Sequence, residues 1–201
     1  MKSLGLPFAL TLWLSVIFET SVEGQRIYWV DSRTPAIKRA NADGSNAESI
    51  VTEMMTINHP HGVALDVAEG KMYWTDGPVF RSNLDGTSVE GPIVTGSNQW
   101  IALDLVAGKM YLSDYAKIRR ANLDGSQLET VVASKEFGAR AIAVDPHDGK
   151  IYWTDSQLES EKIVGTIRRA NLDGSNVEEL VTSDVAYPNG IALDLSTGKM
   201  Y

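Results

Sequence analysis

Short apolar stretches alternate with polar positions along most of this chain, and each stretch is bounded by glycine, aspartate, asparagine or proline. One phrase has the form Tyr-Trp-Thr-Asp and recurs at 27–31, 72–76, 110–114 and 151–155. These stretches are rich in β-branched and aromatic residues and are too short for helices, so the pattern predicts β-strands. We therefore expect an all-β fold.

Two further phrases return in a constant order around the first. An Ala-Leu-Asp type of phrase precedes all copies but the first, at 62–66, 100–104, 141–145 and 190–194. An Asn-x-Asp-Gly turn follows each copy, at 41–44, 83–86, 122–125 and 171–174. Glycine tolerates positive φ and aspartate bonds its own backbone, which predicts hairpin turns. Since a fourth apolar stretch follows each turn, every period of ~40 residues predicts one four-stranded antiparallel sheet.

A single four-stranded sheet that is apolar on both faces cannot shield those faces from water. Copies that stack face to face around an axis do shield them, and they leave only short edges. The repeat therefore predicts a β-propeller whose blades are four-stranded antiparallel sheets. Because no Ala-Leu-Asp phrase precedes 27–31, we expect the first copy to supply only strands two to four of its blade.

The repeated residues resemble a known family. Tyr-Trp-Thr-Asp at 73–76 and 152–155, with Arg-Ala-Asn-Leu-Asp-Gly at 120–125 and 169–174, is similar to the YWTD or class B repeat of the low-density lipoprotein receptor. The resemblance covers 25–201 and implies a six-bladed propeller with the YWTD strand second from the axis. We then expect about four of the six blades, or about 17 of 24 strands, with the missing blades needed to close the ring.

The first 24 residues lie outside the repeat. Lys2 is followed by an uncharged apolar run at 4–18, and Val22–Gly24 offers a small residue for a signal peptidase. This pattern predicts a cleaved signal peptide over 1–24 and a propeller domain over 25–201. A retained signal anchor is the alternative, although the run is shorter than the ~20 residues of a spanning helix. We expect a secreted, periplasmic or extracellular protein without a membrane span after cleavage.

Composition excludes several classes of protein. The net charge of −8 is unfavourable for binding nucleic acid, which requires a clustered basic surface. The chain has no cysteine, so neither a disulfide framework nor a thiolate metal site is expected. No phosphate-binding glycine loop and no Gly-x-Ser-x-Gly elbow occurs, and no cofactor is predicted.

Residues that recur in all or most copies favour a structural role. In the second strands they are Tyr28, Trp29, Asp31, Tyr73, Trp74, Asp76, Tyr111, Asp114, Tyr152, Trp153 and Asp155. In the third strands they are Arg39, Arg81, Arg120 and Arg169. We expect each aspartate to hydrogen-bond the neighbouring arginine, an ion or ligand site being the alternative. The tryptophans are predicted to pack between blades with their indole N–H groups bonded.

Functional residues are expected where the copies differ. Loops that lead into the first strand share one rim of a propeller with loops that join the second and third strands. The candidates for partner binding on this rim are His61, Trp100, Tyr115, Arg140, Tyr187 and Asn189. The insertion at 156–165 adds a charged loop on the same rim, which favours recognition, although loop length also drifts freely.

The sequence favours a non-catalytic binding module that presents its rim loops to a protein or peptide, and the resemblance implies the same. His59 and His61 are weak candidates for metal ligands, because no third ligand is evident. The alternative is a metal-dependent propeller enzyme of lactonase or lyase type, with His61 and Asn189 in its central channel. A sensor domain tethered by an uncleaved N-terminal helix is a third hypothesis.

Overall fold

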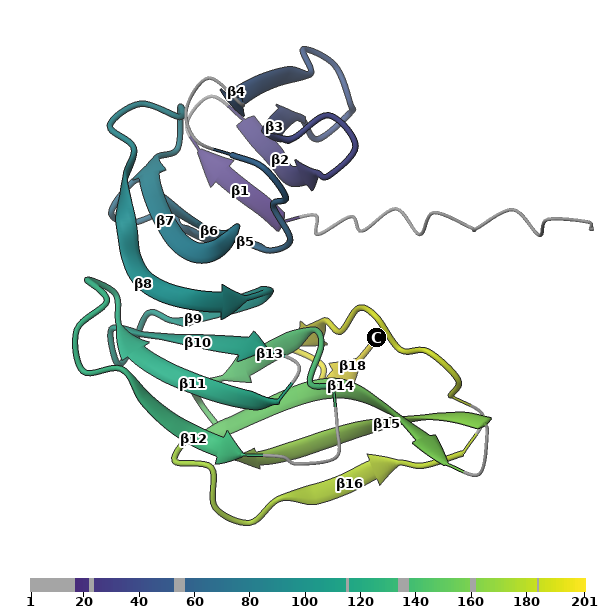
Figure 1. Cartoon of the computed structure of the whole chain (residues 1–201). Helices are drawn as coiled ribbons and strands as arrows, with labels where there is room; N and C mark the ends of the chain where they lie inside the picture. The colour runs from purple at the N-terminus through teal and green to yellow at the C-terminus, as the bar shows by residue number, and fades with distance from the viewer. Residues whose placement is uncertain are drawn as a thin grey trace, which may run out of the picture.

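The computed structural model describes residues 17–21, 24–52, 57–114, 116–133, 138–159, 162–183 and 185–201. Within these residues the fold is all-β, with four four-stranded antiparallel sheets and a two-stranded sheet at the C-terminus. Strands follow chain order across every sheet, so each sheet is a meander, as predicted. The sheets succeed one another along an open arc, from β1–β4 to β17–β18 (Figure 1).

Each sheet contains one copy of the repeat. The first sheet comprises β1 (Ile17–Ser21), β2 (Gly24–Asp31), β3 (Ala36–Asn41) and β4 (Glu48–Thr52). The second comprises β5 (Val63–Asp66), β6 (Lys71–Thr75), β7 (Gly77–Asn83) and β8 (Glu90–Asn98). The third comprises β9 (Trp100–Asp104), β10 (Lys109–Asp114), β11 (Lys117–Asn122) and β12 (Glu129–Ala133). The fourth comprises β13 (Ile142–Asp145), β14 (Lys150–Glu159), β15 (Lys162–Asn171) and β16 (Glu178–Val181), and β17 (Leu193–Asp194) pairs with β18 (Lys199–Met200).

Strand β1 corrects the expected composition of the first sheet. The first copy was predicted to lack a first strand, but Ile17–Ser21 pairs antiparallel with β2, with Ile17 opposite Tyr28. The free edge of β2 carries unpaired backbone N–H and C=O groups, and the adjoining segment is able to satisfy them. The described residues therefore contain 18 strands. The rest of the predicted signal peptide, 1–16 and 22–23, lies outside the described residues.

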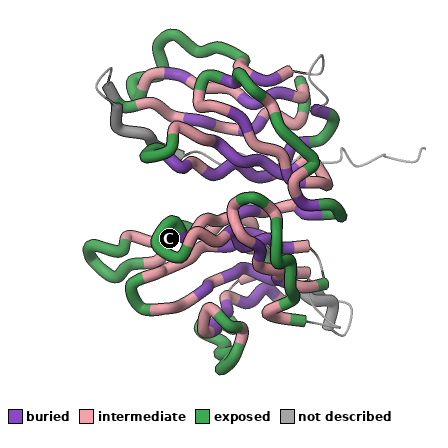
Figure 2. The backbone as a smooth tube through the Cα atoms, turned by 90° about the vertical axis from the view of Figure 1, so that its left-hand side faces the viewer, coloured by how far each residue is buried: buried purple, intermediate pink, exposed green. Residues whose placement is uncertain are grey.

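The hydrophobic core lies between successive sheets. The first cluster joins Tyr28, Ile37 and Val51 of the first sheet to Met72 and Trp74 of the second. Equivalent clusters lie between the second and third sheets and between the third and fourth. Figure 2 shows buried residues along the strands and exposed residues at the turns. Packing between modules, which the apolar faces predicted, therefore supplies the core.

The asparagine–glycine turns pack against the preceding sheet. Gly86 has a φ of +82°, and a Cβ atom there would collide with the carbonyl oxygen of Ile50 in β4. Gly125 and Gly174 approach Ile93 and Val131 in the same way. Only glycine fits such a backbone-to-backbone approach at positive φ. Gly44 has nearly the same φ, +81°, but nothing lies within 4 Å of the position of its Cβ atom.

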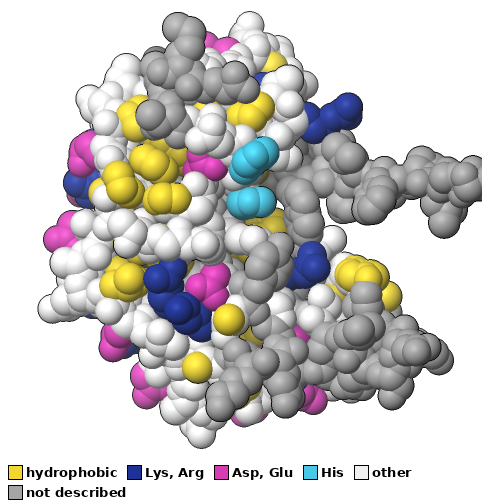
Figure 3. Space-filling view, viewed as in Figure 1, with side chains coloured by type: hydrophobic (Ala, Val, Ile, Leu, Met, Phe, Trp, Pro, Cys, Tyr) yellow, Lys and Arg dark blue, Asp and Glu magenta, His cyan; other side chains and the backbone are white. Residues whose placement is uncertain are grey.

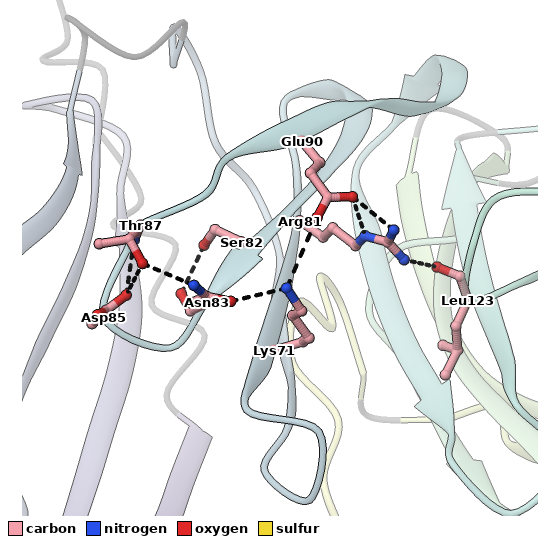
Figure 4. A network of polar contacts seen from close by, with 8 residues as sticks. All are labelled: Lys71, Arg81, Ser82, Asn83, Asp85, Thr87, Glu90 and Leu123. Atoms are coloured by element: carbon pink, nitrogen blue, oxygen red, sulfur yellow. Dashed lines mark hydrogen bonds and ion pairs between the residues drawn. The ribbon is translucent and has the colours of Figure 1, made fainter.

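The repeated arginines connect adjacent sheets, and the prediction that they bond the strand-end aspartates is wrong. Arg81 donates to Glu90 at 2.7 Å and to the carbonyl oxygen of Leu123 in the next sheet at 3.4 Å (Figure 4). The register explains the error, because Arg81 lies opposite Tyr73 in β6 and opposite Glu90 in β8. The corresponding Arg–Glu pairs are Arg39–Glu48, Arg120–Glu129 and Arg169–Glu178.

The tryptophans follow the predicted packing only in part. Trp74 and Trp153 are 1% and 3% exposed and lie in the clusters between sheets. The indole N–H of Trp74 has no hydrogen-bond partner, contrary to expectation. Trp29 is only partly buried, because Tyr28 and Val30 occupy the face of β2 that meets the second sheet and alternation turns Trp29 to the other face.

Candidate functional site

The aspartates that end the second strands hold the backbone of the rim. Asp31 accepts hydrogen bonds from the backbone N–H groups of Arg33 and Thr34 at 2.9 and 3.0 Å. The ammonium of Lys38 lies 2.7 Å from its carboxylate. Hydrogen bonds from Lys38 and Thr34 hold the pKa of Asp31 well below its usual range. This carboxylate is therefore committed to a turn.

Asp76 and Asp114 are committed in similar ways. Asp76 accepts hydrogen bonds from the backbone N–H groups of Asn58 and His59, in the loop that leads to β5, at 2.6 and 2.7 Å. Asp114 accepts from the backbone N–H groups of Ala116 and Lys117, both at 3.0 Å. These contacts satisfy backbone N–H groups that a loop leaves without partners. A structural role for Asp76 and Asp114 is therefore favoured over a ligand site.

Asp155 differs from the other three aspartates. The β14–β15 hairpin continues past it to the pair Glu159 and Lys162, so no tight turn supplies backbone donors. The side chain is 1% exposed, and a hydrogen bond from the side chain of Trp153 favours its ionised form. Arg168 Nε lies 3.4 Å from Oδ2. Burial raises the pKa of Asp155, opposed by the charge of Arg168.

One rim position has the same backbone geometry in successive sheets but a different side chain in each. This position directly precedes the Ala-Leu-Asp type of phrase of each repeat, and its occupants are His61, Gln99, Arg140 and Asn189. The backbone N–H groups of the first three donate to the carbonyl oxygens of Thr75, Ser113 and Thr154 at 3.0, 2.9 and 2.7 Å.

The carbonyl groups at this position are fixed as well. Thr75 Oγ1 donates to the carbonyl oxygen of Gln99 at 2.6 Å, and Ser113 Oγ donates to that of Arg140 at 2.6 Å. The scaffold therefore fixes the backbone while leaving the side chain free to vary. We refer to His61, Gln99, Arg140 and Asn189 as the rim ring. Gln99 was not among the residues predicted from sequence.

The structure brings two members of the rim ring together. Arg140 Nη1 donates to Asn189 Oδ1 at 2.9 Å, although 49 residues separate them. Tyr187 lies two residues before Asn189, and its side chain is 54% exposed. An exposed aromatic ring beside an arginine–asparagine pair combines apolar area with oriented hydrogen-bonding groups, which is typical of protein recognition.

His59 and His61 lie in the loop that leads to β5, on the same rim. Figure 3 shows histidine side chains side by side near the open middle of the arc, with charged side chains on the same face. Burial lowers the pKa of His61, opposed by the charge of Asp76, so its imidazole is neutral at pH 7. No group of three or more His, Cys, Asp or Glu residues that could hold a metal ion occurs in the described part of the chain.

Trp100 and Tyr115 were also predicted to be rim residues that bind a partner. Trp100 begins β9 opposite Ser113, and it packs against the cluster between the third and fourth sheets rather than standing on the surface. Tyr115 lies outside the described residues.

The extended β14–β15 hairpin is joined to the loop that carries Tyr187. The N–H of Gly165 donates to the carbonyl oxygen of Val185 at 2.8 Å. A Cβ atom at Gly165 would collide with Val185 and Pro188. The insertion at 156–165 therefore extends the strands and supports the neighbouring rim loop. A glycine at the end of the insertion was the sequence signal for this close approach, and sequence reasoning missed it.

Comparison with solved structures shows the fold. The nidogen/laminin complex superposes with a TM-score of 0.72 at 20% identity, over 94% of this chain and 79% of that chain. A gluconolactonase from Xanthomonas campestris superposes with a TM-score of 0.57 at 11% identity, over 94% of this chain and 82% of that one. At these identities the likeness concerns the propeller architecture alone.

Sequence comparison is more specific. The chain is 34% identical over 146 residues to low-density lipoprotein receptor-related protein 5 of Mus musculus, covering 66% of this chain and 9% of that protein. It is 30% identical over 161 residues to the vitellogenin receptor Yl of Drosophila melanogaster, covering 75% of this chain and 8% of that protein. The chain thus spans less than a tenth of the length of either receptor.

A family match agrees with these relatives. Residues 25–67 and 149–195 match the low-density lipoprotein receptor repeat class B. No helix among the described residues is long and apolar enough to cross a membrane. The recurring phrases, the meander topology and these similarities show that the chain belongs to the family of low-density lipoprotein receptor class B, or YWTD, repeats.

Proposed function

We propose that this chain is a non-catalytic, extracytoplasmic binding module that presents the rim ring and Tyr187 to a protein or peptide ligand. The main support for this proposal is the variation of the side chains in the rim ring. Four equivalent positions of the sequence repeat hold a histidine, a glutamine, an arginine and an asparagine. The backbone contacts leave these side chains free to vary, and variable loop residues on a rigid scaffold are where binding residues are concentrated.

The other polar residues of this rim support the proposal by what they already bond. The carboxylates of Asp31, Asp76 and Asp114 accept hydrogen bonds from backbone N–H groups. The side chains left to meet a ligand are those at the variable positions. A chain of the nidogen/laminin complex has the same fold as this chain. It provides a precedent for a propeller of this kind in a protein complex.

Location forms part of the proposal. We infer that residues 1–24 act as a signal peptide and that the mature chain begins near Gln25. Cleavage there removes β1 and exposes the inner edge of β2. Mass spectrometry of the N-terminus of the secreted protein tests this inference: a start near Gln25 supports it, and a retained Met1 contradicts it.

Selection of peptides on the immobilised chain tests the binding function. Peptides from a displayed library are expected to bind the wild-type chain and to lose tenfold or more in affinity on Tyr187→Ala or Arg140→Ala, because central aromatic and arginine side chains contribute most of the binding energy at interfaces. Val106→Ala is the matched control, since Val106 is 88% exposed in the turn between β9 and β10 on the opposite rim. Binding that depends on Val106 and not on the rim residues would contradict the proposal.

The enzymatic alternative has a direct test. Metal analysis of the purified chain is expected to find no stoichiometric divalent ion. A tightly held ion, lost together with a lactonase activity on His61→Ala, would favour the enzyme instead.

A further inference from the structure

Gln25, near the start of β2, occupies a position that recurs in the other repeats. It lies three residues before Tyr28, the tyrosine of the first Tyr-Trp-Thr-Asp type of phrase. The residues at the same distance from the repeated tyrosine in the next three repeats are Gly70, Gly108 and Gly149. The first repeat therefore has a glutamine where the others have a glycine.

One backbone hydrogen bond shows that these positions are equivalent in the structure. The carbonyl oxygen of Gln25 accepts a hydrogen bond from the N–H of Ala42, in the turn after β3, at 2.9 Å. The carbonyl oxygen of Gly70 accepts one from the N–H of Leu84, in the turn after β7, at 3.0 Å. The other two glycines make the same contact with leucines of the corresponding turns. The fold thus holds Gln25 through its carbonyl group, and this contact requires no residue ahead of Gln25.

The position has room for a larger group. Gln25 is exposed. At its three equivalents, Gly70, Gly108 and Gly149, nothing lies within 4 Å of the position that a Cβ atom would take. A side chain or a small ring therefore fits at this point of the rim that lies opposite the rim ring.

This exposure does not depend on which segment forms the first strand of the sheet. In the second sheet the first strand ends at Asp66, opposite Lys71, so Gly70 lies beyond the paired residues. The same register in the first sheet places Gln25 beyond the end of a strand that pairs as β5 does. Strand β1 extends further and places Thr20 opposite Gln25, but the proposed cleavage removes β1.

We propose that the mature chain begins with a pyroglutamate formed from Gln25, which rests on the proposed function because it requires signal-peptide cleavage after Gly24. Cleavage turns the backbone nitrogen of Gln25 into an α-amine. This nitrogen attacks Cδ of the side-chain amide of the same residue and closes a five-membered lactam. The new N–Cδ bond replaces the Cδ–Nε2 bond, and the amide nitrogen leaves as ammonia with one proton from the α-amine. The reaction consumes no water and needs no oxidant or other co-reactant.

The lactam changes the charge and the reactivity of the N-terminus. An α-amino group titrates at about pH 8 in peptides, so a free N-terminus is mostly protonated at pH 7. Ring closure removes this positive charge beside Arg26. It also closes the chain to aminopeptidases, which require a free α-amine. The pairing of Arg26 with Asn41 begins one residue later, so β2 and β3 keep their register.

Mass spectrometry of the protein secreted by cells that express the full chain tests the proposal. A lysine-specific protease releases the peptide 25–38, because Lys38 is the first lysine after Gln25. We expect the mass of this peptide to be lower, by one ammonia, than the mass calculated for N-terminal glutamine. We also expect an aminopeptidase to remove no residue from the folded chain. A synthetic 25–38 peptide with N-terminal glutamine, carried through the same steps, measures ring closure during handling.

Gln25→Asn provides the matched control. The variant keeps the side-chain amide but lacks one methylene group, so closure would require a strained four-membered ring. We expect its N-terminal peptide to have the full calculated mass and the folded variant to be degraded by the aminopeptidase. Circular dichroism checks that the variant is folded.

The possible outcomes separate this proposal from the proposed function. A secreted chain that begins at Gln25 with the full glutamine mass, or with a mass loss no more frequent than in the synthetic peptide, overturns the pyroglutamate and leaves signal-peptide cleavage intact. A chain that retains Met1 overturns both. Peptide binding through Tyr187 is expected to be the same in the wild-type chain and in Gln25→Asn, because the two residues lie on opposite rims.

Discussion

The three internal boundaries between sheets and the outer face of the first sheet use the same sequence elements with different results. At an internal boundary, an arginine reaches the next sheet and a glycine turn rests on the preceding strand, as Arg120 and Gly174 do. On the outer face, Gly44 has the same turn geometry, but nothing lies within 4 Å of the position of its Cβ atom. Local sequence therefore sets the turn, whereas the neighbouring sheet decides what the turn contributes to stability.

Each repeat supplies one side of an interface, which is complete only where another sheet packs against it. Trp74 is buried against the first sheet, and Trp29, at the same repeat position, is only partly buried because no described sheet lies beyond it. Pairs of equivalent residues, one internal and one at an end, thus provide matched controls within one chain. Substitutions at the two members of such a pair should differ in their effect on stability, and the largest difference is expected for the tryptophans.

Removal of a tryptophan should separate the two environments most clearly. Trp74→Ala is expected to lower the free energy of unfolding by about 3–5 kcal/mol, because a large buried side chain leaves a cavity. Trp29→Ala should cost about 1–2 kcal/mol, since its side chain already meets solvent. Urea titration measures both values. Equal losses would show that the two positions are packed alike.

Truncation of the arginines tests the link between sheets. Arg120→Ala removes a donor to Leu172 and a partner of Glu129, so a loss of about 1.5–3 kcal/mol is expected. Arg169→Ala removes an exposed ion pair and should cost less than about 1 kcal/mol. Thermal unfolding of both variants at one pH checks the order, and a larger loss for Arg169→Ala would refute this account of the link.

The smallest difference concerns two strand-end aspartates and depends on pH. The pKa of Asp31 is lowered in the folded state, so its contribution is present above the unfolded pKa near 3.8 and is lost as pH falls below it. Asp31→Asn should therefore destabilise the chain at pH 7, by no more than about 1 kcal/mol.

Asp155 should show the opposite sign. Its pKa is raised in the folded state, so ionisation favours the unfolded chain as pH rises above about 3.8. Asp155→Asn should stabilise the chain at pH 7, and the gain should vanish at acid pH. Urea titrations at pH 3 and pH 7 measure both variants, and a stabilising effect of Asp31→Asn would contradict the assignment of its carboxylate to the turn.

The sequence was sufficient to predict the strands, the meander and the propeller, because the periodic phrases and the glycine turns are local signals. It was not sufficient to identify which side chains pair with one another on neighbouring strands. Arg81 was paired with Asp76 by proximity in sequence, whereas the register places it opposite Tyr73 and Glu90. Strand β1 was missed because its segment has no copy elsewhere in the chain to compare with.

The candidate site was predictable in its location and less so in its members. Arg140, Asn189 and His61 lie where the rim was expected, and the pair between Arg140 and Asn189 emerged only in three dimensions. Trp100 was expected at the surface because it is aromatic and variable, but the pleat turns it toward the core. Gln99 was missed, although alignment of the residue before each Ala-Leu-Asp type of phrase would have found it.

The central claim is that each glycine turn is half of an interface that the adjacent sheet completes. Gly125→Ala and Gly44→Ala test it most directly, because the two residues share a turn and have φ angles of +85° and +81°. Both substitutions incur the left-handed strain of about 1–2 kcal/mol. Only Gly125→Ala also collides with the carbonyl oxygen of Ile93, so its loss in free energy of unfolding should exceed that of Gly44→Ala by about 2 kcal/mol or more. Equal losses in the two variants, measured by urea unfolding, would contradict the claim.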